Sequence, residues 1–184
     1  MALTYSTMPP LGSRAPGFSL PGTDGKTYSL AGFKDKKVLV VVFMCNHCPY
    51  VRAVLDRLIQ VQNDYRERGV QLAGINPNDV SRYPDDSPEE MKYLVRDKKI
   101  PFPYLFDETQ AVARAYDAVC TPDIYVYGKD RTLLYRGRID DNWKEPDKVS
   151  RTDLRDAIDD ILAGRQAPGE QFPSMGCSIK WKQD

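Results

Sequence analysis

Apolar residues form one uninterrupted run in the first quarter of the chain, at residues 38–44 (Val-Leu-Val-Val-Val-Phe-Met). A run this short and this rich in branched side chains is typical of a strand that is buried on both faces of a sheet. The pattern therefore predicts a central strand. In an open α/β sheet, the carboxyl end of such a strand is where ligands bind and chemistry takes place.

Helical periodicity follows this run. Apolar side chains recur every three or four residues from Val51 to Tyr65, and Gly69 is placed to end the helix. Residues 70–75 are a second apolar run, which is closed by the polar sequence at 76–79. Strand, helix and strand in this order imply a parallel pair of strands joined by a right-handed crossover.

Shorter elements surround this unit. They are predicted, in chain order, as a β-hairpin at residues 15–30 with its turn at 21–25, a helix from Ser87 to about Asp97, a strand at 102–106, a helix that residues 107–110 cap and that runs through Tyr116, a β-hairpin of residues 124–127 with 133–136, and a last helix that Ser150 caps and Gly164 ends. Residues 165–184 show little periodicity. We expect residues 1–164 to form one domain and residues 165–184 to pack on it as a carboxyl-terminal tail.

The composition limits the classes of partner. The 26 basic and 26 acidic residues cancel, which removes the usual electrostatic reason for binding nucleic acid or an anionic membrane. The amino-terminal region lacks a basic start followed by an apolar stretch, and no apolar run reaches the roughly 18 residues that span a bilayer. We therefore expect a soluble, cytoplasmic protein that binds neither nucleic acid nor a membrane.

Two cysteines follow the central strand directly, in the sequence Cys45-Asn46-His47-Cys48. Four cysteines in 184 residues are too few for a disulfide-stapled scaffold, so their close spacing indicates catalysis or metal binding. Two thiols separated by two residues can close a disulfide across the first turn of a helix. The pair therefore predicts thiol–disulfide redox chemistry.

This chemistry requires a thiolate, because a thiol is a poor nucleophile and a poor leaving group. A free thiol has a pKa of about 8.5, and CxxC sites at helix amino termini lower it to about 3.5–7.5. Unpaired helix N–H groups near Cys45 and a cationic His47 would both favour the thiolate. We predict that Cys45 is the exposed attacking sulfur, that Cys48 is the more buried resolving sulfur, and that His47 assists them.

Other interpretations of these residues stay open. A zinc site usually needs four ligands, and the remaining cysteines, Cys120 and Cys177, are single, so we expect no metal. Two inert core cysteines are disfavoured because the Asn46-His47 insert at the end of a strand is poor core material. His47, the one histidine of the chain, can also be a solvated turn residue without a role.

The order of the elements resembles the thioredoxin fold, with a CxxC at the first core helix, an X-Pro at Thr121-Pro122, and a final hairpin and helix. The opening segment at residues 15–20, followed by 24–26, is similar to the amino-terminal hairpin of the peroxiredoxin and alkyl hydroperoxide reductase branch of that superfamily. More narrowly, the chain resembles bacterial thioredoxin-like redoxin-domain proteins in the segments 43–51, 75–79, 136–142 and 176–181.

The resemblance implies a thioredoxin-like α/β fold, in which helices flank a central mixed sheet. An amino-terminal β-hairpin and an irregular carboxyl-terminal tail are added to this core. The resemblance also implies a cis bond at Thr121-Pro122, whose backbone lies beside the cysteines and presents main-chain groups to an extended substrate. We therefore expect Asn46, Thr121 and Pro122 to bind substrate.

Two departures from the family pattern bear on the mechanism. Residues 38–44 lack the acidic residue that thioredoxins carry in the strand before the CxxC, so the acceptor for the proton of Cys48 is unidentified. Peroxiredoxins carry a proline and a threonine ahead of their peroxidatic cysteine. Counted back from Cys48, those two positions hold Val41 and Cys45.

Three further residues have two interpretations each. Cys120 is either a third redox-active thiol or, as we favour, a small buried hydrophobe. Cys177 either resolves a disulfide or, as we favour, packs as the tail folds back. Trp143 either lines a substrate groove or contributes only packing.

We therefore predict a thiol–disulfide oxidoreductase that cycles through Cys45 and Cys48, acts on a disulfide in a protein or a small molecule, and is reduced again by a cellular dithiol donor. The alternative is an antioxidant peroxidase, in which peroxide oxidises Cys48 to a sulfenic acid and Cys45 resolves it. A third alternative is a non-enzymatic binding module on the thioredoxin fold. We expect no cofactor.

Overall fold

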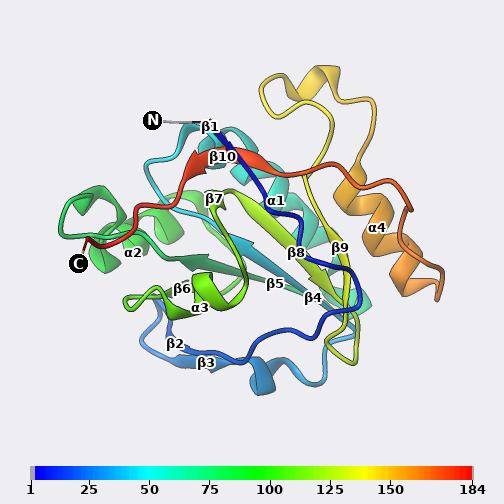
Figure 1. Cartoon of the computed structure of the whole chain (residues 1–184), viewed down its shortest axis with the longest axis horizontal. Coiled ribbons are helices and arrows are strands. Elements are labelled where there is room, and N and C mark those ends of the chain that lie inside the picture. The colour runs from blue at the N-terminus through cyan, green and yellow to red at the C-terminus, as the bar shows by residue number, and fades with distance from the viewer. Residues whose placement is uncertain (1–2, 184) are drawn as a thin grey trace.

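The uninterrupted apolar run forms the central strand of a five-stranded sheet in the computed structural model, which describes residues 3–183 (Figure 1). The sheet has the order β6-β5-β4-β8-β9, and its strands are β4 (Val38–Phe43), β5 (Val70–Asn76), β6 (Tyr104–Phe106), β8 (Asp123–Tyr127) and β9 (Leu133–Arg136). β5 is parallel to both β4 and β6, whereas β8 is antiparallel to both β4 and β9. The predicted mixed sheet is confirmed.

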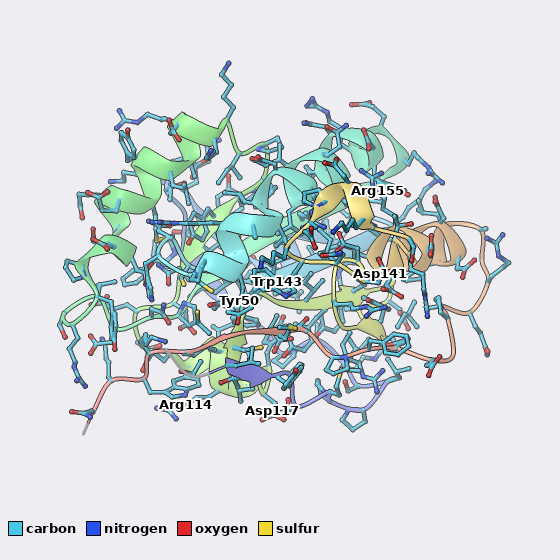
Figure 2. All side chains as sticks on the ribbon, turned by 90° about the horizontal axis from the view of Figure 1, so that it is seen from above. Tyr50, Arg114, Asp117, Asp141, Trp143 and Arg155 are labelled. Carbon is cyan, nitrogen blue, oxygen red and sulfur yellow. The ribbon has the colours of Figure 1, made fainter. Side chains whose placement is uncertain are left out.

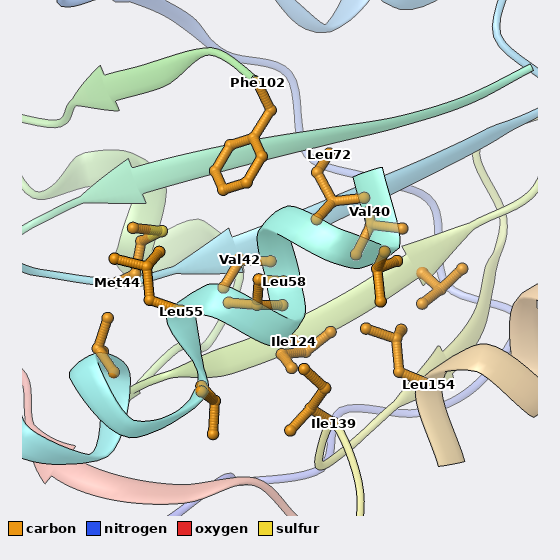
Figure 3. Packing of buried hydrophobic residues seen from close by; sticks show 14 of the residues in the cluster. Val40, Val42, Met44, Leu55, Leu58, Leu72, Phe102, Ile124, Ile139 and Leu154 are labelled. Carbon is orange, nitrogen blue, oxygen red and sulfur yellow. The ribbon is translucent and has the colours of Figure 1, made fainter. Parts of the chain in front are cut away.

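Successive side chains of β4 point to opposite faces of the sheet, and both faces are covered, so all six residues of the strand are buried. On one face, Val40 and Val42 pack with apolar side chains of α1 (Pro49–Tyr65) and α4 (Asp153–Leu162), as Figure 3 shows. A strand enclosed in this way needs no polar residue, which explains the unbroken apolar sequence.

The opposite face is covered by the amino-terminal hairpin and a short helix. The hairpin pairs β2 (Ser19–Pro21) with β3 (Thr27–Ser29), as predicted, and the helix is α3 (Ala111–Ala115). Phe43 of β4 meets the ring of Tyr116 edge-on at a centroid distance of 5.5 Å. Phe43 and Tyr116 belong to the apolar cluster on this face of the sheet, which also contains Phe18 and Phe33.

The helix predicted to begin at Ser87 starts where it was expected, whereas α4 starts later than expected. α2 (Pro88–Lys98) is capped by Ser87, whose hydroxyl accepts a hydrogen bond from the Glu90 N–H. The cap of α4 is Thr152, not Ser150, because the Ser150 hydroxyl is bound to the Asp141 carboxylate. Short 3-10 turns lie at Leu30–Phe33, Arg66–Arg68, Pro84–Asp86 and Pro146–Lys148. None of the helices within residues 3–183 has the length and apolar character needed to cross a membrane.

A second, three-stranded sheet joins the two ends of the chain. Its order is β1-β10-β7, and its strands are β1 (Leu3–Tyr5), β10 (Met175–Ser178) and β7 (Cys120–Thr121). In Figure 1 the red carboxyl-terminal segment carries β10 between β1 and β7. The tail was expected to be irregular, but this part of it is a strand paired on both edges. The division of the chain at residue 164 stays a prediction.

Candidate active site

The four cysteines of the chain lie around Thr121, beyond the carboxyl end of β4. The Cys45 Sγ is 3.4 Å from the Thr121 Oγ1, and the Cys48 thiol donates to the Thr121 carbonyl oxygen at 3.0 Å. Cys120 precedes Thr121 in β7, and Cys177 of β10 is paired opposite Thr121. All four side chains are buried. Three distant segments therefore build one group of thiols, here called the thiol cluster.

The helix begins at a different cysteine from the one that was expected. Pro49 is the first residue of α1 and Cys48 is its N-cap, whereas Cys45 lies three positions earlier. The unpaired N–H groups of the helix terminus are therefore close to Cys48. The predicted exposure of Cys45 is also wrong, because Cys45 is 1 % exposed and Cys48 is 0 % exposed.

The environment separates the pKa values of these two thiols. A hydrogen bond from Cys45 is the main cause that lowers the pKa of Cys48 to about 5, against the effect of burial, and the Cys177 side chain and the Val51 N–H add to it. The same bond to Cys48, followed by burial and the charge of Asp86, raises the pKa of Cys45 well above its usual value. The Thr121 carbonyl oxygen accepts from the Cys48 thiol and so favours the protonated form of Cys48. The side chains of Cys45 and Cys177 and the Val51 N–H favour the thiolate, and they outweigh it. The negative charge therefore belongs on Cys48 and the proton on Cys45.

Asp86 is the functional residue that the sequence did not indicate. Its side chain is 0 % exposed and accepts the backbone N–H groups of Asn46 and His47 at 2.8 and 3.1 Å. It also lies 2.6 Å from the His47 Nδ1 and accepts from the Asn78 Nδ2 at 2.8 Å. One buried carboxylate thus fixes the turn between the two cysteines. Asp86 ends a polar loop remote in sequence from this turn, and no periodicity or motif marks it.

His47 is held rigidly and is not a solvated turn residue. Its side chain is 13 % exposed, and its ring stacks on Tyr83 with a centroid distance of 5.4 Å. Asp86 orients the ring through Nδ1, while Nε2 is buried and has no hydrogen-bond partner among the described residues. A carboxylate on one ring nitrogen fixes the tautomer and the direction of the other. The catalytic role of His47 stays a prediction.

One set of side chains within residues 3–183 brings potential metal ligands together. The ligand atoms of Cys45, His47 and Asp86 lie within 4.8 Å of one another. Both Asp86 oxygens already accept hydrogen bonds, and the His47 Nδ1 is one of their partners. A metal ion would have to replace these bonds, so we assign the group to hydrogen bonding.

The residues expected to bind substrate are engaged within the protein. The Asn46 side chain donates to the Asp85 carbonyl oxygen at 2.9 Å and accepts from the Tyr104 hydroxyl at 3.1 Å. The Thr121-Pro122 bond is cis, as the fold resemblance implied. The backbone beside it, however, is paired with β10. An extended substrate could bind there only after β10 had left, and substrate binding by these residues stays a prediction.

Cys120 is the thiol that is least suited to attack. It is 0 % exposed, and burial, followed by the charge of Asp123, raises its pKa. Asp123 is itself buried, which raises the pKa of this carboxyl to about 7, against a hydrogen bond from Tyr125. These surroundings fit the interpretation of Cys120 as a small buried hydrophobe.

An apolar pocket borders the thiol cluster. It has a volume of about 250 Å³, and Tyr50, Pro122, Trp143 and Met175 are among its lining residues. Three of these lie two positions along the chain from Cys48, Cys120 and Cys177, respectively. The rings of Tyr50 and Trp143 form one wall, with centroids 4.4 Å apart (Figure 2). Trp143 therefore lines a cavity, as one of its two interpretations required.

Known proteins resemble the chain over most of its length. The sequence profile of the AhpC/TSA family matches residues 11–136. A provisionally named peroxiredoxin of Mycobacterium tuberculosis is 26 % identical over 123 residues, which are 67 % of this chain and 73 % of that protein.

Two solved structures extend this comparison. An uncharacterised conserved protein from Geobacillus kaustophilus is 45 % identical, with a TM-score of 0.95 over 100 % of this chain and 98 % of that one. The thioredoxin domain of a thiol–disulfide oxidoreductase from Bacteroides vulgatus is 22 % identical, with a TM-score of 0.60 over 69 % of this chain and 87 % of that domain. The second likeness establishes a thioredoxin-like fold.

Proposed function

We propose, from the premise that the chain belongs to the AhpC/TSA family, that it is a thiol-dependent peroxide reductase in which Cys48 is the attacking sulfur. The family match confirms the resemblance to redoxins of the thioredoxin superfamily. It also supports the general assignment of this chain to the redox enzymes. The observation that carries the proposal is the position of Cys48 at the N-cap of α1, where a hydrogen bond from Cys45 lowers the pKa of Cys48 to about 5. Such a thiol is ionised at neutral pH, and the thiolate is the reactive form.

The burial of the thiols favours a small oxidant over a protein disulfide. Cys45 and Cys48 are 1 % and 0 % exposed, so a polypeptide cannot reach either sulfur without a rearrangement. The backbone of Thr121, where an extended substrate is expected in this fold, is paired with β10. A hydroperoxide needs neither a free strand edge nor an exposed sulfur, only a path for a few atoms.

The proposed cycle uses both cysteines after the central strand. The Cys48 thiolate attacks one oxygen of the peroxide, the O–O bond breaks, and the other oxygen leaves as water or an alcohol after taking up a proton. Cys48 is then a sulfenic acid. Cys45 attacks its sulfur, which forms the Cys45–Cys48 disulfide and releases water, and an external dithiol reduces this bond.

Peroxide consumption tests the proposal directly. The purified protein is supplied with dithiothreitol as the dithiol and with hydrogen peroxide or cumene hydroperoxide as the oxidant. We expect repeated turnover with at least one of the two. Oxidation of dithiothreitol no faster than in the absence of protein would refute the proposal.

Thiol–disulfide exchange through the same cysteines is the second candidate. The backbone of Thr121, whose carbonyl oxygen lies 3.0 Å from the Cys48 sulfur, favours it, since the fold resemblance places an extended substrate there. It requires β10 to separate from β7. Reduction of insulin disulfides at a rate that does not depend on peroxide would support this candidate.

The thiolate of Cys48 is expected to form at low pH. Because its pKa is lowered to about 5, its ionised fraction rises through this pH and is nearly complete at neutrality. The ultraviolet thiolate absorbance that Cys48→Ser removes should have its midpoint there. Cys45→Ala removes the donor and should shift the midpoint toward the ordinary value of about 8.5. An unchanged midpoint in Cys45→Ala would contradict the assigned cause.

The pocket beside the thiol cluster is proposed to receive the apolar part of an organic hydroperoxide. Trp143→Ala removes a wall of this pocket, and we expect it to lower kcat/KM for cumene hydroperoxide by about tenfold, or roughly 1.4 kcal/mol. Turnover of hydrogen peroxide should stay nearly constant. Trp181→Ala is the matched control, because Trp181 packs on Arg114 outside the pocket. Equal losses with both peroxides would count against the pocket.

A further inference from the structure

Strand β10 holds a third thiol against the attacking sulfur. Cys177 is paired opposite Thr121, whose carbonyl oxygen accepts from the Cys48 thiol at 3.0 Å. Cys177 is 2 % exposed and forms a side-chain hydrogen bond with Cys48. The carboxyl-terminal strand thus occupies the edge at which an extended substrate is expected, and it presents a cysteine there.

The approach of β10 depends on a residue without a side chain. A Cβ on Gly176 would lie 1.9 Å from the Thr121 carbonyl oxygen and 3.1 Å from the Pro122 Cδ. The first of these contacts is shorter than any that real Cβ atoms make, and it is to a backbone atom, so any larger residue would push the strand away. Glycine at this position is therefore what allows Cys177 to reach the thiol cluster.

Hydrogen bonds beyond β10 keep the strand in register. The Ile179 N–H donates to the Val119 carbonyl oxygen at 2.9 Å, and the Lys180 N–H donates to the Asn78 Oδ1 at 2.9 Å. On the other edge, β1 pairs with β10 from Leu3 to Tyr5. The strand is held from both sides, and Cys177 has a fixed position next to Cys48.

We propose that Cys177 is a second resolving thiol for Cys48, and that β10 holds it at the edge where an extended substrate would otherwise bind. The oxidant in this step is the peroxide of the proposed function, on which the inference rests. The Cys177 sulfur attacks the sulfur of the Cys48 sulfenic acid. An S–S bond forms, the S–O bond breaks, and the hydroxyl leaves with the thiol proton as water.

The charge on Cys48 adds to the effect of burial on the Cys177 thiol. Burial, followed by the hydrogen bond to Cys48 and its charge, raises the pKa of Cys177. A sulfenic acid at Cys48 is neutral, so oxidation removes the charge that suppresses ionisation of Cys177. Cys177 is therefore unreactive in the reduced protein and becomes more reactive once Cys48 has been oxidised. Cys45 can later attack Cys48 in the new disulfide and return Cys177 to a thiol.

Disulfide mapping in Cys45→Ser tests the inference. The variant is oxidised either with hydrogen peroxide or with diamide, which takes up two hydrogens from a thiol pair and needs no peroxidase chemistry. The products are alkylated, digested without reductant and identified by mass spectrometry. We expect one main cross-linked peptide, Cys48–Cys177, with Cys120 still open to alkylation after denaturation.

Two further variants serve as a test of geometry and as its control. Gly176→Ala in the Cys45→Ser background should displace β10 and lower the yield of the Cys48–Cys177 peptide at least severalfold. Cys120→Ser in the same background should leave the yield unchanged. If Cys45→Ser does not fold, the Cys45–Cys48 and Cys48–Cys177 disulfides are quantified in the wild-type protein after diamide treatment.

The outcomes separate the two proposals. A Cys48–Cys177 peptide with diamide, without any reaction with peroxide, supports the third thiol and refutes the peroxidase. A dimedone-labelled Cys48 sulfenic acid with peroxide, without this peptide under either oxidant, supports the peroxidase and overturns the inference. A Cys48–Cys120 peptide in place of Cys48–Cys177 would also overturn it.

Discussion

Replacing Cys48 with serine is expected to abolish peroxide reduction, whereas replacing Cys45 with serine is expected to leave the first oxidation intact. A serine hydroxyl is not ionised near neutral pH and cannot form a sulfenic acid. We expect Cys48→Ser to lower kcat/KM by more than roughly 10³-fold, the scale of removing a nucleophile. Cys45→Ser keeps a hydrogen-bond donor beside Cys48, so the thiolate should survive while its usual resolving partner is lost.

Dimedone labelling distinguishes the roles of the two cysteines. After one equivalent of peroxide, Cys48→Ser should carry no label, and the double variant Cys45→Ser/Cys177→Ser should accumulate it at Cys48. If instead Cys45→Ser abolishes oxidation and Cys48→Ser does not, the attacking sulfur is Cys45, as the sequence suggested. The binding module would be favoured if Cys45→Ser and Cys48→Ser both bound a partner as well as the wild-type protein does, and if the wild-type protein showed no turnover.

The elements of the sheet could be predicted because burial leaves a pattern in the sequence. β4 is enclosed on both faces, which requires the unbroken apolar run, and α1 faces the sheet with one stripe, which requires helical spacing. The spacing of Cys45 and Cys48 likewise indicated redox chemistry. Patterns of this kind are local, since each depends on residues close together in the chain.

The prediction that the helix terminus lies beside Cys45 was wrong for a reason that the sequence contained. Proline is favoured at the first position of a helix, where its missing N–H costs nothing. Pro49 therefore places the N-cap at Cys48, and it moves the helix terminus away from Cys45. Given this signal, Cys48 was the better candidate for the thiolate.

Asp86 and β10 could not be predicted in this way, because each acts across the fold. The position of Asp86 under the Asn46-His47 turn follows from the way the Pro84–Asp86 turn packs after β5. The strand at Gly176 forms because the Thr121 backbone offers it an edge. Neither segment has a periodicity of its own, so only the tertiary structure brings it to the thiols.

Asp86→Asn is expected to destabilise the fold by about 1–3 kcal/mol, the cost of leaving a buried hydrogen-bond donor without its acceptor. The asparagine oxygen can still accept the two backbone N–H groups. Its NH2 group, however, would then face the Asn78 Nδ2, which is also a donor, at the 2.8 Å of the present bond. At about 2–4 °C per kcal/mol for a chain of this size, the Tm should fall by roughly 2–12 °C in a thermal denaturation experiment.

Asp85→Asn is the matched control for this prediction, because Asp85 is the exposed neighbour of Asp86 and undergoes the same chemical change. Its free energy of unfolding should stay within about 0.5 kcal/mol of the wild type. Equal losses in both variants would show that charge alone matters, and not the buried hydrogen bonds of Asp86.

The pH dependence of the Asp86→Asn effect provides a second measurement. Burial alone would raise the pKa of Asp86, but hydrogen bonds from His47 and Asn78 outweigh it and hold the pKa below its usual value. A carboxyl whose pKa is lower in the folded state stabilises the fold above its unfolded pKa of about 3.9, and this contribution is lost as the pH falls through the folded value. The stability difference between wild type and Asp86→Asn, measured by urea denaturation, should therefore be constant near neutrality and shrink below about pH 4. A difference that grows as the pH falls would mean that Asp86 is protonated in the folded protein, and that it does not fix the turn between the cysteines as a carboxylate.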